Sequence, residues 1–167
     1  QLMEVAAYCH ETNVAFSLTP YSKKEVDFLV DSCNVPYIKV ALMDLNNYPY
    51  LEYIAQTGVP IVLATGMSDM NEIHKAIETI ERTGNRNLCI LHCISIYPPE
   101  IPTIHLNNIL GLREEFPQYP IGFSDHSIGI EIAIASTALG AALIENHFTL
   151  DHQKKGMNNQ LANEQPE

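Results

Sequence analysis

Basic residues are scarce in this chain, and their scarcity excludes some classes of partner. Only 9 of the 167 residues are Lys or Arg, against 20 Asp or Glu, which gives a formal net charge of -11. A protein that binds nucleic-acid phosphates or an anionic membrane surface needs the opposite balance of charge. We therefore expect no nucleic-acid partner and no membrane partner, although a few local cations could still bind a small anionic substrate.

Long apolar runs and paired cysteines are also missing. No apolar stretch reaches the roughly 20 residues that span a bilayer, and no basic-then-apolar leader opens the chain. The four cysteines form no CxxC pair, so we expect thiols in the core and no disulfides. These absences predict a cytoplasmic protein.

What the chain does contain is an alternation of short apolar runs with helical patterns. Six apolar runs predict strands at residues 14–17, 37–41, 61–64, 88–91, 120–123 and 142–145. Helical patterns cover residues 23–33, 50–57, 71–82, 106–116 and 130–139. This alternation predicts βαβ units around a parallel sheet, and the continuous hydrophobicity of the strands indicates that both sheet faces are covered.

Polar residues follow almost every predicted strand, which favours one parallel architecture over the others. They are Thr19, Lys39, Thr65, Ser95, Ser124, His126, Glu145 and His147. The chain has no GxGxxG or GxxxxGK[ST] loop, so a dinucleotide-binding or P-loop fold is disfavoured. Active sites of TIM (β/α)8 barrels lie at the carboxyl ends of the strands. We predict an incomplete (β/α)8 barrel of about six βα units, with two strands missing upstream.

The last two strands carry the strongest chemical signal. Ser124 and His126 share one strand face, as do Glu145 and His147, because side chains alternate along a strand. Two imidazoles beside a carboxylate, with positions left open, are a donor set for a catalytic divalent ion. A lone histidine at a strand end is more often structural, and we assign that default to the other five histidines.

Several motifs occur in the order found in the sialic acid synthase family, which this chain resembles over essentially its whole length. The family comprises N-acetylneuraminate synthases and their legionaminic and pseudaminic acid relatives. The motifs lie at residues 16–21, 39–41, 65–67, 91–98, 122–126 and 145–151, and the tail at 156–162 looks closer to the legionaminic-type branch.

The resemblance implies a metal-assisted condensation of phosphoenolpyruvate with an N-acylated mannosamine-type sugar, giving a nine-carbon 2-keto acid. The cofactor would be Mn²⁺ or Mg²⁺, and the full-length protein would be a homodimer. Carried over residue by residue, the family pattern implies that His126 and His147 are metal ligands. It also implies that Lys39 and Ser124 bind the phosphate group of phosphoenolpyruvate. The resemblance further implies that Glu145 and Tyr97 are catalytic residues that face the sugar and its developing charge. The implied substrate-binding residues are Ser95, Thr65 and Asn158.

The chain departs from the family pattern at several positions. Leu42 and Ala64 stand where the family has phosphate-binding serines, and Asn146 and Asn158 replace a lysine and an aspartate. Each lost hydrogen bond to a charged group could cost roughly 1.5 to 3 kcal/mol. An alternative function is therefore a catalytically degraded member that binds a sugar acid or serves as an oligomer subunit.

Other interpretations remain open for the reaction and for single residues. A heptulosonate or octulosonate phosphate synthase would use the same barrel, but would show a metal-binding cysteine and more basic residues. Thr65 with Gly66 fits a simple turn as well as a substrate contact, and Asp125 is expected to accept from His126. We expect residues 1–167 to be a partial catalytic barrel that lacks the first two strands and a C-terminal antifreeze-like (SAF) domain. Such a chain alone should be inactive.

Overall fold

The computed structural model describes residues 1–156 and 158–165. Met157, which belongs to the tail motif, lies outside the described residues, as do Pro166 and Glu167. Contacts divide the chain into two compact units. The first comprises Gln1–Leu63 and Ser68–Leu88, and the second comprises Ala64–Met67 and Cys89–Glu167.

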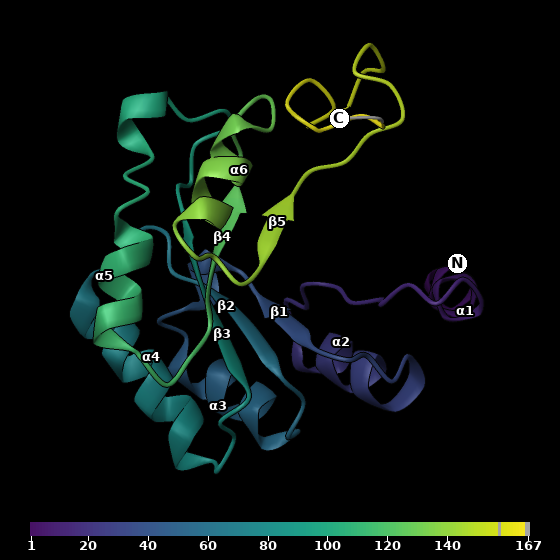
Figure 1. Cartoon of the computed structure of the whole chain (residues 1–167). Helices are drawn as coiled ribbons and strands as arrows, with labels where there is room; N and C mark the ends of the chain where they lie inside the picture. Colours follow the sequence, from purple (N-terminus) through teal and green to yellow (C-terminus); the bar gives the residue numbers. More distant parts are fainter. Residues whose placement is uncertain (157, 166–167) are drawn as a thin grey trace. The chain divides into compact units, whose positions relative to one another are not determined.

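The described residues form five strands, which follow one another in the sheet in chain order, β1-β2-β3-β4-β5 (Figure 1). Every strand pairing that the structure details is parallel. A helix follows each of the first four strands, as the alternating pattern predicts. The predicted fold is confirmed as an incomplete (β/α)8 barrel, with one strand fewer than the six expected.

The first unit is built on β1 and β2, which pair with Ile38 opposite Ile61 and Val40 opposite Leu63. Its elements are α1 (Leu2–Glu11), α2 (Lys23–Asp27), the π-helical η1 (Phe28–Ser32), β1 (Ile38–Val40), the 3₁₀ turn η2 (Leu42–Asp44), α3 (Tyr48–Gln56), β2 (Ile61–Ala64) and α4 (Met70–Arg82). The four residues of β2 are all buried, as expected for a strand covered on both faces.

Local signals fix where α4 begins and ends. Asp69 accepts from the Glu72 amide at 2.9 Å, and the Glu72 side chain accepts from the Asp69 amide at 3.1 Å. This reciprocal pair is a capping box, which satisfies two amides that the first helical turn leaves free. At the other end Gly84 takes the positive φ of 89° that favours glycine after a helix.

The segment at residues 14–17 is not a strand, and the prediction of one there was wrong. It has no regular secondary structure and no place in the sheet, Val14 is 58% exposed, and the Ser17 hydroxyl donates to the Tyr37 carbonyl at 2.6 Å. An apolar run shows that a segment can be buried, whereas a strand also requires a backbone neighbour. The run at 14–17 was therefore insufficient evidence for a sixth strand.

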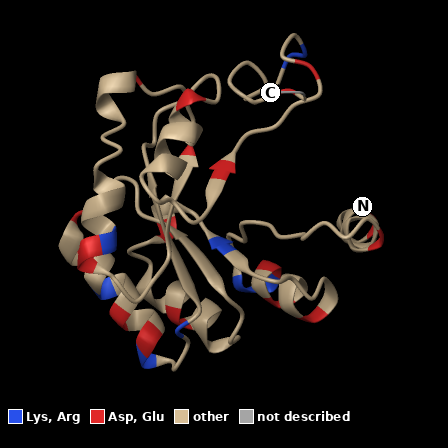
Figure 2. Cartoon of the chain, in the orientation of Figure 1, with Lys and Arg blue, Asp and Glu red and all other residues tan. Residues whose placement is uncertain are grey.

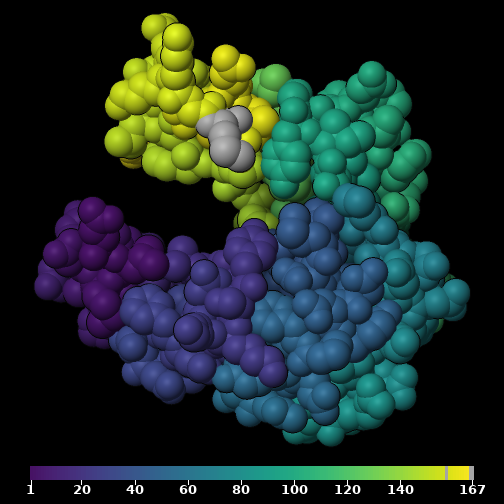
Figure 3. Space-filling model, turned by 180° about the vertical axis from the view of Figure 1, so that it is seen from behind, coloured from purple at the N-terminus to yellow at the C-terminus, as the bar shows by residue number. Residues whose placement is uncertain are grey.

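Helix α1 leaves much of its apolar surface uncovered. Its residues form a knob at the edge of the first unit (Figure 3), and within the helix only Ala6 is buried. Leu2, Met3, Val5 and Tyr8 are 47% to 66% exposed. Apolar surface of this kind normally packs against another element.

The second unit carries the ends of the strands that matter for chemistry. Its elements are β3 (Leu88–Cys93), the 3₁₀ turn η3 (Ile101–Thr103), α5 (Asn108–Glu115), β4 (Ile121–Asp125), α6 (Glu131–Ala138) and β5 (Ile144–Asn146). Strand β4 is buried throughout and lies between β3 and β5, with Cys93 opposite Ser124 and Ser124 opposite Glu145.

Gly122 is required in the middle of β4, because no side chain fits there. A Cβ at this position would lie 2.5 Å from the Leu143 carbonyl oxygen and 2.5 Å from Leu91 Cδ2. We expect Gly122→Ala to lower the free energy of unfolding by about 1 to 3 kcal/mol through overpacking. Chemical denaturation measures the change. Gly111→Ala, in α5 with nothing within 4 Å of its added Cβ, is the control and should be neutral or stabilising. Equal stability of the two variants would contradict the packing described for β4.

The thiols and the helices agree only in part with the composition. In the part of the chain that the structure describes, only Cys93 of the four cysteines is buried, and Cys9, Cys33 and Cys89 are half-buried, so the expected core location holds for one of the four. Among the described residues, no helix is both long enough and apolar enough to cross a membrane.

Candidate functional site

Four of the predicted site residues come from the carboxyl ends of β4 and β5. Ser124 and Glu145 are partners in the ladder between these strands, and His126 and His147 follow two residues later on each chain segment. Figure 2 shows acidic residues at the ends of both strands. Because side chains alternate, the serine, the glutamate and the two histidines lie on one face, as the sequence predicts.

His126 is held in one tautomer by a backbone group. Its Nδ1 lies 2.8 Å from the Ile94 carbonyl oxygen, so Nδ1 carries the proton and donates it. Its Nε2 lies 3.4 Å from Ser124 Oγ. Burial lowers the pKa of His126, against the opposing effect of the Ile94 carbonyl. The result is a neutral imidazole with Nε2 as an electron-pair donor.

The rings of Tyr97 and His147 form a cluster with this imidazole. The Tyr97 ring stacks on His126 with centroids 4.0 Å apart and planes 25° apart. The His147 ring centroid lies 5.6 Å from that of His126 and 5.9 Å from that of Tyr97. Tyr97 is 48% exposed, while His126 is only 8% exposed. The tyrosine therefore covers one side of the buried imidazole and keeps a solvent-facing edge.

The donor set suits one divalent ion with most of its positions open. The carbonyl that binds Nδ1 of His126 is the kind of outer partner that orients metal-binding histidines. In residues 1–156 and 158–165, no three His, Cys, Asp or Glu side chains gather closely enough to hold an ion by themselves. The protein would supply the two imidazoles, and water or substrate oxygens would complete the coordination.

Asp125 was expected to accept a hydrogen bond from His126, but it bonds Ser127 instead. Its Oδ1 accepts from the amide of Ser127 at 2.9 Å and from the Ser127 hydroxyl at 2.7 Å. The orienting group of His126 is the Ile94 carbonyl, which sequence reasoning missed because every residue carries a carbonyl. The Ser127 contact had a local signal, since an Asp commonly bonds the backbone two residues on.

The other predicted substrate contacts are more dispersed. The Thr65 hydroxyl donates to the Leu91 carbonyl at 3.0 Å, and the Gly66 amide donates to Cys93 Sγ at 3.2 Å. A turn at Gly66 and Met67 follows Thr65 directly. Ser95 is half-buried shortly after β3, and Asn158 is half-buried in the C-terminal segment.

The two predicted phosphate positions fall in different units. Lys39 is the central residue of β1 in the first unit, half-buried between two buried neighbours. Ser124 is in the second unit and 4% exposed. Of the two departures from the family, Leu42 lies in η2, and Ala64, the last residue of β2, is 2% exposed.

His92 has the structural role that was expected of it. Its Nε2 lies 2.7 Å from the Ile104 carbonyl, and its ring is buried against Phe123 with centroids 5.6 Å apart. Burial lowers the pKa of His92. A neutral histidine that is bonded inside the core has no further chemistry to explain.

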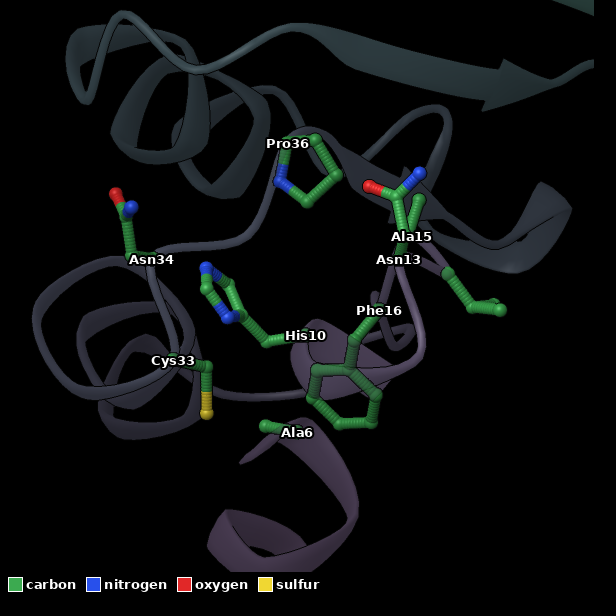
Figure 4. A pocket seen from close by; sticks show the side chains of 9 residues that line it. Ala6, His10, Asn13, Ala15, Phe16, Cys33, Asn34 and Pro36 are labelled. Atoms are coloured by element: carbon green, nitrogen blue, oxygen red, sulfur yellow. The ribbon is translucent and has the colours of Figure 1, made fainter. Parts of the chain in front are cut away.

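A separate cavity of about 430 Å³ lies within the first unit. His10 of α1, Asn13, Phe16, Cys33 and Pro36 are among the residues that line it (Figure 4). Its lining contains none of the predicted site residues.

Comparison with known proteins covers the whole chain. An uncharacterized protein of Methanocaldococcus jannaschii is 43% identical over 162 residues, 97% of this chain and 48% of its own length. The N-acetylneuraminate-9-phosphate synthase of Homo sapiens is 39% identical, with 93% of this chain and 43% of its own length matched. The N,N'-diacetyllegionaminic acid synthase of Campylobacter jejuni is 34% identical, with 98% and 49% matched. The chain thus spans about half the length of these curated relatives.

Solved structures agree with the fold. The N-acetylneuraminic acid (sialic acid) synthetase of Leptospira borgpetersenii, in complex with citrate, superposes with a TM-score of 0.93 at 30% identity, covering 97% of this chain and 56% of that one. A truncated 3-deoxy-D-arabino-heptulosonate 7-phosphate synthase of Thermotoga maritima superposes with a TM-score of 0.69 at 16% identity, over 98% of this chain and 75% of that one. The second likeness shows the fold alone.

The family model tests which family the chain belongs to. The NeuB family model matches residues 1–167. Its match covers every strand end described above, including those that carry His126 and His147. The chain belongs to the NeuB family.

Proposed function

We propose that the polypeptide containing these residues condenses phosphoenolpyruvate with the open-chain aldehyde of an N-acylated mannosamine-type sugar, forming a nine-carbon 2-keto sugar acid. The observation that carries this proposal is the strand-end cluster of Ser124, His126, Glu145 and His147 on one face of β4 and β5 in a NeuB chain. The names of the sialic and legionaminic acid synthases among the relatives support a product of this class.

The reaction makes one carbon–carbon bond and replaces the carbon–oxygen bond to phosphate with one to water, while a proton from the water balances the protonation of the aldehyde oxygen. The enol carbon of phosphoenolpyruvate attacks the aldehyde carbon, water adds to the neighbouring cationic carbon, and the resulting tetrahedral centre expels phosphate. Lys39 and Ser124 would hold the phosphate, one as a cation and one as a hydroxyl donor. Glu145 would lie against the developing positive charge, which a carboxylate stabilises.

A Mn²⁺ or Mg²⁺ ion held by His126 and His147 would supply Lewis-acid polarisation of the aldehyde oxygen. Tyr97, stacked on His126, would face the sugar with its exposed edge. Ser95, Thr65 and Asn158 would add substrate contacts. Thr65 already donates to Leu91, so it has only its oxygen lone pairs left to offer.

The curated relatives are about twice as long as this chain, so further proposals concern the complete polypeptide. We propose a cytoplasmic homodimer in which the first two barrel strands and the C-terminal antifreeze-like domain complete the site. The 167 residues alone should show no turnover.

One feature favours a second candidate, a member of the family that binds a sugar acid without catalysing its formation. Leu42 and Ala64 replace two phosphate-binding serines of the family, and a buried alanine offers no hydrogen bond to an anion. Against this candidate stand Glu145 and the two histidines, all of which the chain keeps.

Product analysis distinguishes the two candidates. The complete polypeptide is incubated with Mn²⁺, N-acetylmannosamine and phosphoenolpyruvate labelled with ¹³C at all three carbons. The proposed function predicts a nine-carbon acid that contains the three labelled carbons, with phosphate released in equal amount. Phosphate release without the sugar, or binding of the sugar acid without product, would reject the proposed reaction. Sugar variants that lack the acyl group form the matched control and should react poorly.

A further inference from the structure

The strands that carry the two histidines also place a polar pair on the opposite face of the sheet. Asp125 and Asn146 are partners in the ladder between β4 and β5, and each immediately precedes one of the histidines. Because side chains alternate along a strand, this pair faces away from Ser124 and Glu145. The proposed reaction gives neither residue a role.

Three polar atoms of this pair are buried without a hydrogen-bond partner among the described residues. They are Asp125 Oδ2, Asn146 Nδ2 and Asn146 Oδ1. Asp125 is 0% exposed, and its other oxygen is already engaged by the amide and the hydroxyl of Ser127. Buried polar atoms nearly always have a partner, and a buried carboxylate oxygen without one is costly. Something must therefore satisfy this pair in the folded protein.

The geometry of the ladder selects the ligand. Neighbouring strands lie about 4.8 Å apart, and Asp and Asn have short side chains, so their ends can share one small molecule. A water molecule can donate to Asp125 Oδ2 while it accepts from Asn146 Nδ2. A divalent ion needs more protein donors, and the described residues offer no group of three acidic, His or Cys side chains.

We propose that Asp125 and Asn146 bind one buried water molecule behind the two histidines, and that they act as positioning residues for the ends of β4 and β5. Asp125 also holds Ser127, so it ties the backbone on both sides of His126. Asn146 is the last residue of β5 and directly precedes His147. The water joins the two strand ends and so sets the separation of the two imidazoles.

A crystal structure of the wild-type protein that resolves ordered water tests the site directly. The proposal predicts a density peak within hydrogen-bond distance of both Asp125 Oδ2 and the Asn146 amide. A direct bond between Asn146 Nδ2 and Asp125 Oδ2, with no peak, would overturn it. Thermal stability that differs between Na⁺ and K⁺ at equal ionic strength would identify a monovalent ion there and would equally overturn it.

Two substitutions at one position test the positioning role. Asn146→Leu keeps the size of the side chain but removes both polar atoms, and should lower the melting temperature by on the order of 5 °C. Asn146→Lys places an ammonium group where the water was, beside Asp125 Oδ2, and should restore the lost stability. Asn71→Leu, at an exposed amide of α4, is the control and should change little. An Asn146→Leu protein as stable as the wild type would contradict the role, and if this variant does not fold, the wild-type density decides.

Manganese titration adds a readout that rests on the proposed function. Asn146→Leu should weaken manganese binding about tenfold, as loss of outer-shell partners does, and Asn146→Lys should recover it. Unchanged affinity in Asn146→Leu would show that the pair does not position the histidines. If the wild-type protein binds no manganese, the metal proposal fails, whereas the density and the melting temperatures still test the water site.

Discussion

His126→Ala and His147→Ala should each weaken manganese binding by about 100-fold or more. His126 presents Nε2 as an electron-pair donor because Nδ1 is bonded to the Ile94 carbonyl, and burial keeps the ring neutral. Removing either imidazole removes half of the protein's donors, since the described residues provide no third His, Cys, Asp or Glu to complete a group. Isothermal titration calorimetry measures the affinity.

Two further proteins make that experiment specific. His74→Ala, at an exposed histidine of α4, should bind manganese as the wild type does. His126→Asn keeps a side-chain N–H that can bond the Ile94 carbonyl, so it separates loss of the ligand from loss of the fold. Wild-type affinity in both alanine variants would exclude these histidines as the metal ligands.

Restoring the two family serines should have the largest effect on substrate binding. The double substitution Leu42→Ser with Ala64→Ser returns two hydroxyl donors, and hydrogen bonds to a charged group contribute roughly 1.5 to 3 kcal/mol each. We expect the KM for phosphoenolpyruvate in the complete polypeptide to fall about 100-fold, with little change in the KM for the sugar.

The matched control removes the bulk of Leu42 without adding a hydroxyl. Leu42→Ala should leave the KM for phosphoenolpyruvate near its wild-type value. If the double variant improves only the sugar parameter, the phosphate does not bind where Lys39 and Ser124 are proposed to hold it. If no variant turns over substrate, the binding-protein candidate gains support.

Continuous apolar runs predicted the strands that are buried on both faces, because a short run of this kind is typical of a strand covered on both sides. Strand β2 was predicted with its observed bounds, Ile61–Ala64. The run at 14–17 failed because its pairing depends on a neighbour that the run itself cannot reveal. A strand was therefore predictable from the sequence where burial alone determined that it forms.

For the candidate site, the sequence predicted which side chains share a strand face. Alternation along β4 and β5 placed Ser124 with His126 and Glu145 with His147, and the ladder register confirms that their strands align. The partners of these side chains were not predictable, because they include a backbone carbonyl at Ile94 and a tyrosine ring that arrives from the loop after β3. Such contacts depend on the path of a loop, which hydrophobic periodicity does not describe.

We propose that the ends of β4 and β5 hold one divalent ion between two imidazoles. Anomalous scattering from a crystal of the complete polypeptide grown with manganese would locate this ion. We predict a single strong anomalous peak within bonding distance of His126 Nε2 and a ring nitrogen of His147. A strong peak elsewhere, with no anomalous signal between these two rings, would contradict it.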